Sequence, residues 1–284
     1  MLIGSAIAPA AALSAGGAAA ASDKLAELET RSGGRLGVAI LDTETGRRLA
    51  HRGDERFALC STFKALAAAC VLARVDRGAD RLDRRIVVTP QDVLSYAPIA
   101  KAHVGPAGMT MAALCEAAIT LSDNTAANLL LATFGGPAGL TRYLRSLGDS
   151  VTRLDRIEPA LNEAQPGDPR DTTTPSAMLE DFRRLLLGDA LAPQSRDRLA
   201  GWLVACQTGG HRLRGGLPAA WRIGDKTGSG MRGTTNDVAI AFPPNRAPLI
   251  IAAYLTETTA SEDARAALFA EIGRLAVDLA AKPG

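Results

Sequence analysis

Aromatic and histidine side chains are scarce in this 284-residue chain, and their scarcity argues against several functions. Aromatics make up 4% of the residues, too few for the stacking platforms on which proteins bind exposed bases. The net charge is only +2, so there is no basic field to follow a phosphate backbone. Three histidines and four cysteines occur without an H-E-x-x-H or C-x-x-C spacing. Neither a nucleic-acid partner nor a zinc site is therefore expected.

The N-terminal segment lacks charge altogether. Its first 21 residues contain ten alanines and no charged side chain. Three alanines stand before Ser22, as at the cleavage site of an export signal, although the basic start of such signals is missing. A membrane anchor is the alternative, but Pro9 and the Gly-Ala run make the segment weakly hydrophobic, and no later run is long enough to span a bilayer. We expect residues 1–22 to be a cleaved signal peptide.

Apolar periodicity predicts strands near both ends of the chain and helices between them. Short β-rich runs bounded by turn residues predict strands at 35–41, 47–52, 221–226, 236–242 and 248–255. Apolar spacings of three and four predict helices at 23–31, 61–77, 110–120, 125–133, 137–147, 175–187, 194–205 and 262–280. This order predicts a sheet domain built from both ends of the chain, with a helical domain inserted in the middle.

Ser61 is the only serine followed by a lysine, Lys64, three positions later. On a helix this spacing places both side chains on one face, where an amine can activate a hydroxyl. A serine at a helix start also lies beside the positive end of the helix dipole, where its N–H can stabilise an oxyanion. Alone, the pattern is as typical of a capped helix start with a solvated lysine.

Three further motifs accompany this pair. An S-D-N motif begins at Ser122, just before a helical run, and a K-T-G motif begins at Lys226, at the end of a predicted strand. An E-x-x-L-N motif, from Glu158 to Asn162, lies in a polar loop at 154–172 that is too long for a simple connector. Singly, these motifs are typical of a helix cap, a solvated strand end and an exposed loop acid. Together, in this order, they indicate a serine acyl-transfer enzyme.

With all four motifs present, the chain from about residue 23 onward resembles the class A serine β-lactamases. The resemblance implies an α+β fold of the β-lactamase/DD-peptidase type: an antiparallel sheet flanked by the N- and C-terminal helices, an inserted all-helical domain, and the active site between them. The expected domains are a discontinuous α/β domain at 23–60 and 207–284, and a helical domain at 61–206 that contains the long loop. The implied activity is β-lactam hydrolysis, which gives antibiotic resistance.

The resemblance also implies the catalytic roles. Ser61 opens the lactam ring to give an acyl-enzyme, and Lys64 takes part in the proton transfers of this step. Ser122 passes a proton to the departing lactam nitrogen. Glu158, together with Asn162, activates the water that hydrolyses the ester. Whether Glu158 or Lys64 deprotonates Ser61 is left open by the sequence.

The same resemblance implies how the substrate is held. The residues expected to contact it are Tyr96, Asn124, Asn162, Arg212, Lys226, Thr227, Gly228 and Ser229. Lys226, Thr227 and Ser229 receive the carboxylate of the substrate, and the N–H groups of Ser61 and Ser229 form the oxyanion hole. Asn124 binds the side-chain amide of the substrate.

Tyr96 is expected at the mouth of the site, with an ordinary half-buried tyrosine as the alternative. Many relatives carry an arginine where this chain has Thr235, and Arg212 fits the place that another subset uses instead. Arg156 and Asp171 match an ion pair that closes the loop around the deacylating glutamate.

Cys60 is a departure from one branch of the family. Some carbapenem-hydrolysing relatives bridge a cysteine at this place to one after the K-T-G motif, where this chain has Gly230. We therefore expect Cys60 to pack as a small apolar residue, and carbapenem hydrolysis receives no support from it.

Three other functions compete with this interpretation. A penicillin-binding DD-peptidase shares the S-x-x-K and K-T-G motifs but lacks a dedicated deacylating acid such as Glu158. A non-hydrolysing β-lactam sensor domain would be tethered to a membrane and a signalling partner, and no such extension follows the last predicted helix. An α/β-hydrolase esterase needs a G-x-S-x-G motif, which the chain lacks. The expectation is a monomeric periplasmic or secreted enzyme that needs no cofactor and acts on small β-lactams.

Overall fold

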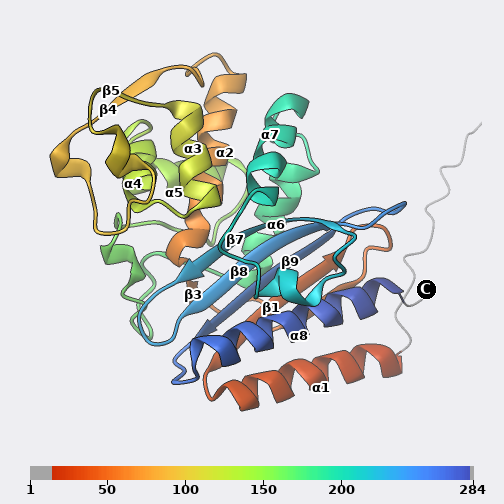
Figure 1. The fold of residues 1–284 in the computed structure, drawn as a ribbon. Helices are drawn as coiled ribbons and strands as arrows, with labels where there is room; N and C mark the ends of the chain where they lie inside the picture. Colours follow the sequence, from red (N-terminus) through yellow and green to blue (C-terminus); the bar gives the residue numbers. More distant parts are fainter. Residues whose placement is uncertain (1–14, 282–284) are drawn as a thin grey trace, which may run out of the picture.

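A five-stranded antiparallel sheet lies between two layers of helices (Figure 1). The computed structural model of the chain describes residues 15–281, so residues 1–14 of the expected signal segment lie outside the described part. The strand order is β2-β1-β9-β8-β7. The strand bounds are β1 (Arg35–Asp42), β2 (Arg48–His51), β7 (Arg222–Ser229), β8 (Thr235–Phe242) and β9 (Leu249–Thr256). Each pair is antiparallel, which confirms the predicted strands and the α+β class.

Both faces of the sheet are covered, and this explains why its central strands carry continuous apolar runs, such as residues 238–242 of β8 and 249–253 of β9. In β9 the side chain of Ile250 joins the core beneath the helical layer, whereas that of Ile251 joins the core beneath α1 (Ala15–Ser32) and α8 (Glu262–Ala281). The two terminal helices lie side by side on this second face (Figure 1). A strand buried on both sides reads as a continuous apolar run instead of an alternating one.

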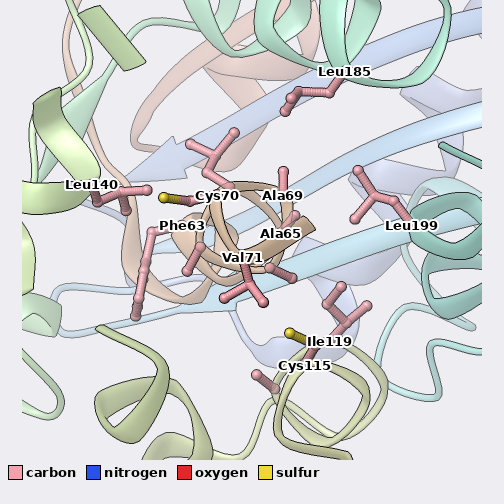
Figure 2. Close-up of a cluster of buried hydrophobic side chains, with 14 of the residues drawn as sticks. Phe63, Ala65, Ala69, Cys70, Val71, Cys115, Ile119, Leu140, Leu185 and Leu199 are labelled. Carbon is pink, nitrogen blue, oxygen red and sulfur yellow. The ribbon is translucent and has the colours of Figure 1, made fainter. Parts of the chain in front are cut away.

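The remaining helices lie on the opposite face of the sheet. Their bounds are α2 (Phe63–Asp76), α3 (Met111–Thr120), α4 (Asn124–Ala132), α5 (Gly136–Ser146), α6 (Pro175–Leu186) and α7 (Pro193–Val204). Eleven of the 14 residues of α2 are buried, so this helix is the centre of the layer. Ile119, Leu140, Leu185 and Leu199 point at it from α3, α5, α6 and α7 (Figure 2). The alanines of α2 let these helices approach closely.

The predicted helices are confirmed, with shifts of one or two residues at most ends and a larger one at the start of the first helix. The helix expected from Ser61 begins with a 3-10 turn, η1 (Cys60–Thr62), before α2 starts, and α1 begins at Ala15 instead of residue 23. Four short strands were not predicted; they form two separate pairs, β3 (Phe57–Ala58) with β6 (Thr172–Thr173) and β4 (Arg85–Val88) with β5 (Gly105–Thr110). Within the described range, none of the helices combines the length and apolar character needed to cross a membrane.

Candidate active site

Ser61 sits in the 3-10 turn that leads into α2, against the end of strand β7. The preceding Cys60 has a left-handed backbone, with φ of 43°, and it turns the chain so that Ser61 is partly exposed. The amide of Asn236 on β8 fixes this turn by donating to the carbonyl oxygens of Ala58 at 2.8 Å and Leu59 at 3.1 Å. The site therefore forms where the helical layer meets the edge of the sheet.

Gly228 is required for this close approach. A Cβ at Gly228 would lie 3.1 Å from the carbonyl oxygen of Leu59 and 3.2 Å from the Cβ of Cys60, which is tighter than ordinary contact. Because glycine has no Cβ, β7 can pack directly on the turn that carries Ser61.

Lys64 is the second residue of α2, one helical turn after Ser61, and is completely buried. Its ammonium group donates to the backbone oxygen of Ser122 at 2.8 Å and to Oδ1 of Asn124 at 2.6 Å, and it lies 2.9 Å from Oε1 of Glu158. These three acceptors use all three protons of an ammonium group. Burial lowers the pKa of Lys64, and the contact with Glu158 opposes this shift.

Glu158 is buried beside the nucleophile. The Ser61 hydroxyl donates to its Oε1 at 3.3 Å, and the amide of Asn162 donates to its Oε2 at 2.5 Å. Its backbone is held by Asn128 of α4, whose side chain accepts from the Glu158 N–H at 3.0 Å and donates to the Glu158 oxygen at 2.9 Å. Glu158 is thus held through its carboxylate by the start of α2 and by Asn162, and through its backbone by α4.

An ion pair between Arg156 and Asp171 joins the two ends of the loop that carries Glu158. Arg156 donates from Nε to Oδ2 of Asp171 at 2.6 Å, and it also pairs with Glu163. The other oxygen of Asp171 accepts from the backbone N–H groups of Asp155 and Arg156 at 2.7 and 2.8 Å. Because Asp171 is fully buried, loss of Arg156 would leave an unpaired charge inside the loop.

Ser122 lies between two lysines. Lys226 Nζ donates to its hydroxyl at 3.0 Å, and Lys64 Nζ lies 3.4 Å from the same oxygen. The next residue, Asp123, is indeed a helix cap: it accepts from Ala126 N–H at the start of α4. A hydroxyl held between two cationic groups is suited to pass on a proton.

The end of β7 gathers groups that suit an anion. Arg212 donates to the carbonyl oxygens of Gly228 and Asn236 at 2.9 and 2.8 Å and to the Ser229 hydroxyl at 2.8 Å. The hydroxyl of Thr227 lies 2.5 Å from that of Thr208. All the predicted substrate-binding residues except Lys226 line one cavity, and Lys226 is buried behind Ser122, which also lines it.

A cavity of about 480 Å³ opens over these groups. It is lined by Ser61, Tyr96, Ser122, Asn124, Asn162, Thr208, Arg212, Thr227, Gly228, Ser229 and Glu262. Tyr96 is half exposed at this cavity and donates to the Leu121 oxygen at 3.1 Å. A second cavity of about 490 Å³ lies on the other side of the loop, but Arg156 is the only predicted site residue that lines it. The chemistry therefore belongs to the first cavity.

Comparison with known proteins gives this site its family. A model of the β-lactamase enzyme family matches residues 20–280. The β-lactamase AST-1 of Nocardia asteroides is 50% identical over 92% of this chain and 84% of its own, and CTX-M-25 of Escherichia coli is 47% identical over 90% and 87%. An ancestral class A β-lactamase of solved structure is 67% identical, with a TM-score of 0.89, over 91% of this chain and 99% of its own.

The chain belongs to the class A β-lactamases. It is accordingly a β-lactam hydrolase, and its activity gives resistance to these antibiotics. A solved relative from Rhodopseudomonas palustris, 59% identical with a TM-score of 0.89, is likewise described as a putative class A β-lactamase.

In this β-lactamase Cys60 is a free, buried cysteine, as expected from the sequence. Burial raises the pKa of its thiol to about 12, so it is inert at neutral pH. A Cβ at Gly230 would lie 2.7 Å from the Cys60 sulfur, so the structure places Gly230 directly against it.

Three residues of the β-lactamase site were missed by sequence reasoning. Asn128 fixes the backbone of Glu158, Thr208 contacts Thr227, and Glu262 lines the cavity. Asn128 and Thr208 belong to no motif, and their partners lie 30 and 19 residues away, so no spacing could reveal them. Glu262 is the first residue of α8, where an acid is ordinary helix-start chemistry.

Proposed function

We propose that Ser61 is the nucleophile of this β-lactamase and that Glu158 receives its proton during acylation. The observation that carries this proposal is the hydrogen bond from the Ser61 hydroxyl to Oε1 of Glu158 at 3.3 Å. Lys64 has all three N–H bonds directed at oxygens, so it acts as a cation that holds Glu158 and not as the proton acceptor. The backbone N–H groups of Ser61 and Ser229 would hold the oxyanion of the tetrahedral intermediate.

Ring opening then breaks the lactam C–N bond, and the nitrogen needs a proton. Ser122 supplies it from its hydroxyl and is reprotonated by Lys226 or Lys64, which both contact that oxygen. The proton that Glu158 received from Ser61 then returns through Lys64, 2.9 Å away, to the lysine that gave one up, and this leaves Glu158 ionised for deacylation. This relay runs without histidine, in keeping with the composition of the chain.

Deacylation requires a water directed at the ester carbon. Glu158 and Asn162, joined at 2.5 Å, are placed to bind this water, and Glu158 takes its proton as the oxygen attacks. A buried carboxylate in contact with the nucleophile is the feature that separates hydrolysis from the stable acylation of a DD-peptidase or a sensor domain. The Arg156–Asp171 ion pair holds this carboxylate by closing its loop.

The substrate carboxylate would bind Thr227 and Ser229, with the charges of Arg212 and Lys226 behind them. Asn124 and Asn162 also line the cavity, where Asn124 would bind the side-chain amide of the substrate, and Tyr96 would lie at the mouth. Gly228 lets the substrate approach the backbone of β7. The proposed steps use these side chains and water, and no cofactor or metal is assigned a role in them.

We further propose that the enzyme is exported and works as a monomer in the periplasm or outside the cell. The charge-free segment 1–22 would act as a signal peptide, with cleavage after its three alanines, between Ala21 and Ser22. The mature chain would consist of an α/β domain, 23–60 and 207–284, and the helical domain, 61–206.

Glu158→Gln tests the proposed mechanism. Glu158 raises the pKa of Lys64, so its loss lets the buried lysine become a neutral amine that can activate Ser61. Acylation should therefore persist, while deacylation falls by about a hundredfold or more. Intact-protein mass spectrometry after mixing with a penicillin should show the enzyme enlarged by one whole substrate.

The matched control is Ser61→Ala, which should hydrolyse nothing and gain no mass. Turnover by Glu158→Gln at the rate of the unaltered enzyme would refute the role of Glu158. Near-normal turnover by Ser61→Ala would refute the nucleophile assignment.

A further inference from the structure

Glu262 is the one acidic side chain among the eleven residues that line the active-site cavity in the described part of the chain. It is exposed at the first position of α8, and no hydrogen bond or ion pair engages its carboxylate within residues 15–281. By contrast Glu271, farther along the same helix, is paired with Arg31 of α1. The charge of Glu262 is therefore available to whatever enters the cavity.

The start of α8 lies near the carboxylate-binding end of the cavity, because the segment that leads into this helix packs on the turn that follows Ser229. The Thr258 N–H donates to the Arg232 oxygen at 3.2 Å, and a Cβ at Gly233 would clash with the Thr258 oxygen. Arg212 donates only to neutral oxygens in its three hydrogen bonds. The cavity thus combines cationic groups that would bind a carboxylate with one separate negative charge.

We propose that Glu262 is a specificity-determining residue that favours β-lactams carrying a positive charge beside their carboxylate. This inference rests on the proposed binding of the substrate carboxylate by Arg212, Thr227 and Ser229. With the carboxylate held there, a group on the neighbouring ring carbon lies at the same end of the cavity as Glu262. Cephalosporins with a cationic group at the 3-position are the substrate class that meets this description, and a second anionic group there would be disfavoured.

The probes are two cephalosporins with the same 2-thienylacetyl side chain, one with a pyridiniomethyl and one with a neutral acetoxymethyl group at the 3-position. The measured quantity is kcat/KM for the pyridiniomethyl cephalosporin divided by kcat/KM for the acetoxymethyl cephalosporin. This ratio cancels effects that are common to both substrates. In Glu262→Gln this ratio should fall about threefold at low salt, the size expected of one exposed charge pair. In Glu262→Lys it should fall further.

Salt provides an independent readout. In the unaltered enzyme the ratio should drop toward that of Glu262→Gln at about 1 M salt, where the Debye length is about 3 Å. A structural effect of the substitution would not follow ionic strength in this way.

Asp263→Asn is the matched control. Asp263 is the next residue in the same first turn of α8 and is equally exposed, but it does not line the cavity. Removing its charge alters the helix terminus in the same way as Glu262→Gln, yet the ratio should stay unchanged. An unchanged ratio in Glu262→Gln, or an equal fall in Asp263→Asn, would overturn the inference. If the unaltered enzyme hydrolysed a penicillin but neither cephalosporin, the inference would be overturned, whereas failure to hydrolyse any of the three would count against the proposed catalytic site.

Discussion

The ammonium group of Lys226 is fully buried at the end of β7, and its pKa is lowered to about 8. Burial is the main cause, and the positive charges of Lys64 and Arg212 act in the same direction. Asp225 opposes the shift. A lysine with this pKa is charged at neutral pH but loses its charge within the range in which enzymes are commonly assayed.

Activity should therefore fall as the pH rises through about 8. The neutral amine attracts a substrate carboxylate less and cannot resupply a proton to Ser122, so kcat/KM should decline, since this parameter reports groups of the free enzyme. Lys226→Arg should move the alkaline midpoint upward by at least about one pH unit, because an arginine stays charged. The measurement is the pH profile of kcat/KM for a penicillin.

Lys24→Arg, on α1 and away from the site, is the control and should keep the midpoint of the unaltered enzyme. If Lys226→Arg leaves the alkaline midpoint in place, the fall of kcat/KM at high pH does not arise from Lys226.

The residues that could be predicted from the sequence are those whose spacing is fixed by local geometry. Ser61 and Lys64 are one helical turn apart, and Ser122 and Asn124 flank a capping aspartate, so each pair is visible as a motif. Glu262 reaches the cavity because the segment before α8 packs on the turn after β7, more than 20 residues earlier in the chain, and such a contact across the fold cannot be recognised in the local sequence.

At the scale of elements, a pair of carboxyl groups joins α6 to the segment that enters the Glu158 loop. Asp181 of α6 is fully buried beside the carboxyl group of Asp149, which follows α5, and neither Asp181 oxygen accepts a hydrogen bond from the described part of the chain, so a proton held on Asp181 can be donated to Asp149. Burial raises the pKa of Asp181 well above the usual range, and the charge of Asp149 adds to this shift, whereas Arg184 and Arg145 oppose it. Asp149 is itself partly desolvated, but hydrogen bonds from Thr152 and other groups lower its pKa, so Asp181 is the partner that holds the proton.

This pair should make the folded enzyme less stable as the pH rises. The folded state keeps a proton on Asp181 that the unfolded chain releases above about pH 4, and each further pH unit costs about 1.4 kcal/mol until the raised pKa is passed. Asp181→Asn can donate the same hydrogen bond without a proton from solution. It should raise the free energy of unfolding at pH 7 by at least about 1 kcal/mol, with no gain near pH 4.

Thermal unfolding measured from pH 4 to pH 8 would show this difference. Asp189→Asn, an exposed position just after α6, serves as the control and should change little at any pH. If Asp181→Asn were less stable than the unaltered enzyme at pH 7, the proton would not reside on Asp181.

Long elements could be predicted because their signals are local. The Thr174 cap and Pro175 mark the start of α6, and the Thr174 hydroxyl does accept from Ala177 N–H at 3.1 Å. The two-residue strands β3 and β6 could not be predicted, because each exists only through its pairing with the other, more than 100 residues away along the chain. Two residues give no periodicity to read.

At the scale of the whole molecule, the helices at the two ends of the described chain, α1 and α8, pack into one hydrophobic core. Helices α1 and α8 lie side by side on the sheet (Figure 1), where Leu25 and Leu28 of α1 are fully buried in the same core as Leu268 and Ile272 of α8. Arg31 adds an ion pair to Glu271 at 2.7 Å. The first buried leucine thus comes only four residues after Ala21, the last residue of the expected signal peptide.

This arrangement predicts that export and folding use separate parts of α1. Cleavage between Ala21 and Ser22 leaves Leu25 and Leu28 in place, so a chain that begins at Ser22 should be as stable as the exported enzyme, whose intact mass should show the same start. Leu25→Ala in that chain should cost about 2–5 kcal/mol, which lowers the melting temperature by roughly 5 °C or more, because it opens a cavity between α1 and the sheet. The exposed Glu27→Ala is the control and should shift the melting temperature little. Exported protein that retained residues 1–21, or that had lost Leu25, would contradict this division of the helix.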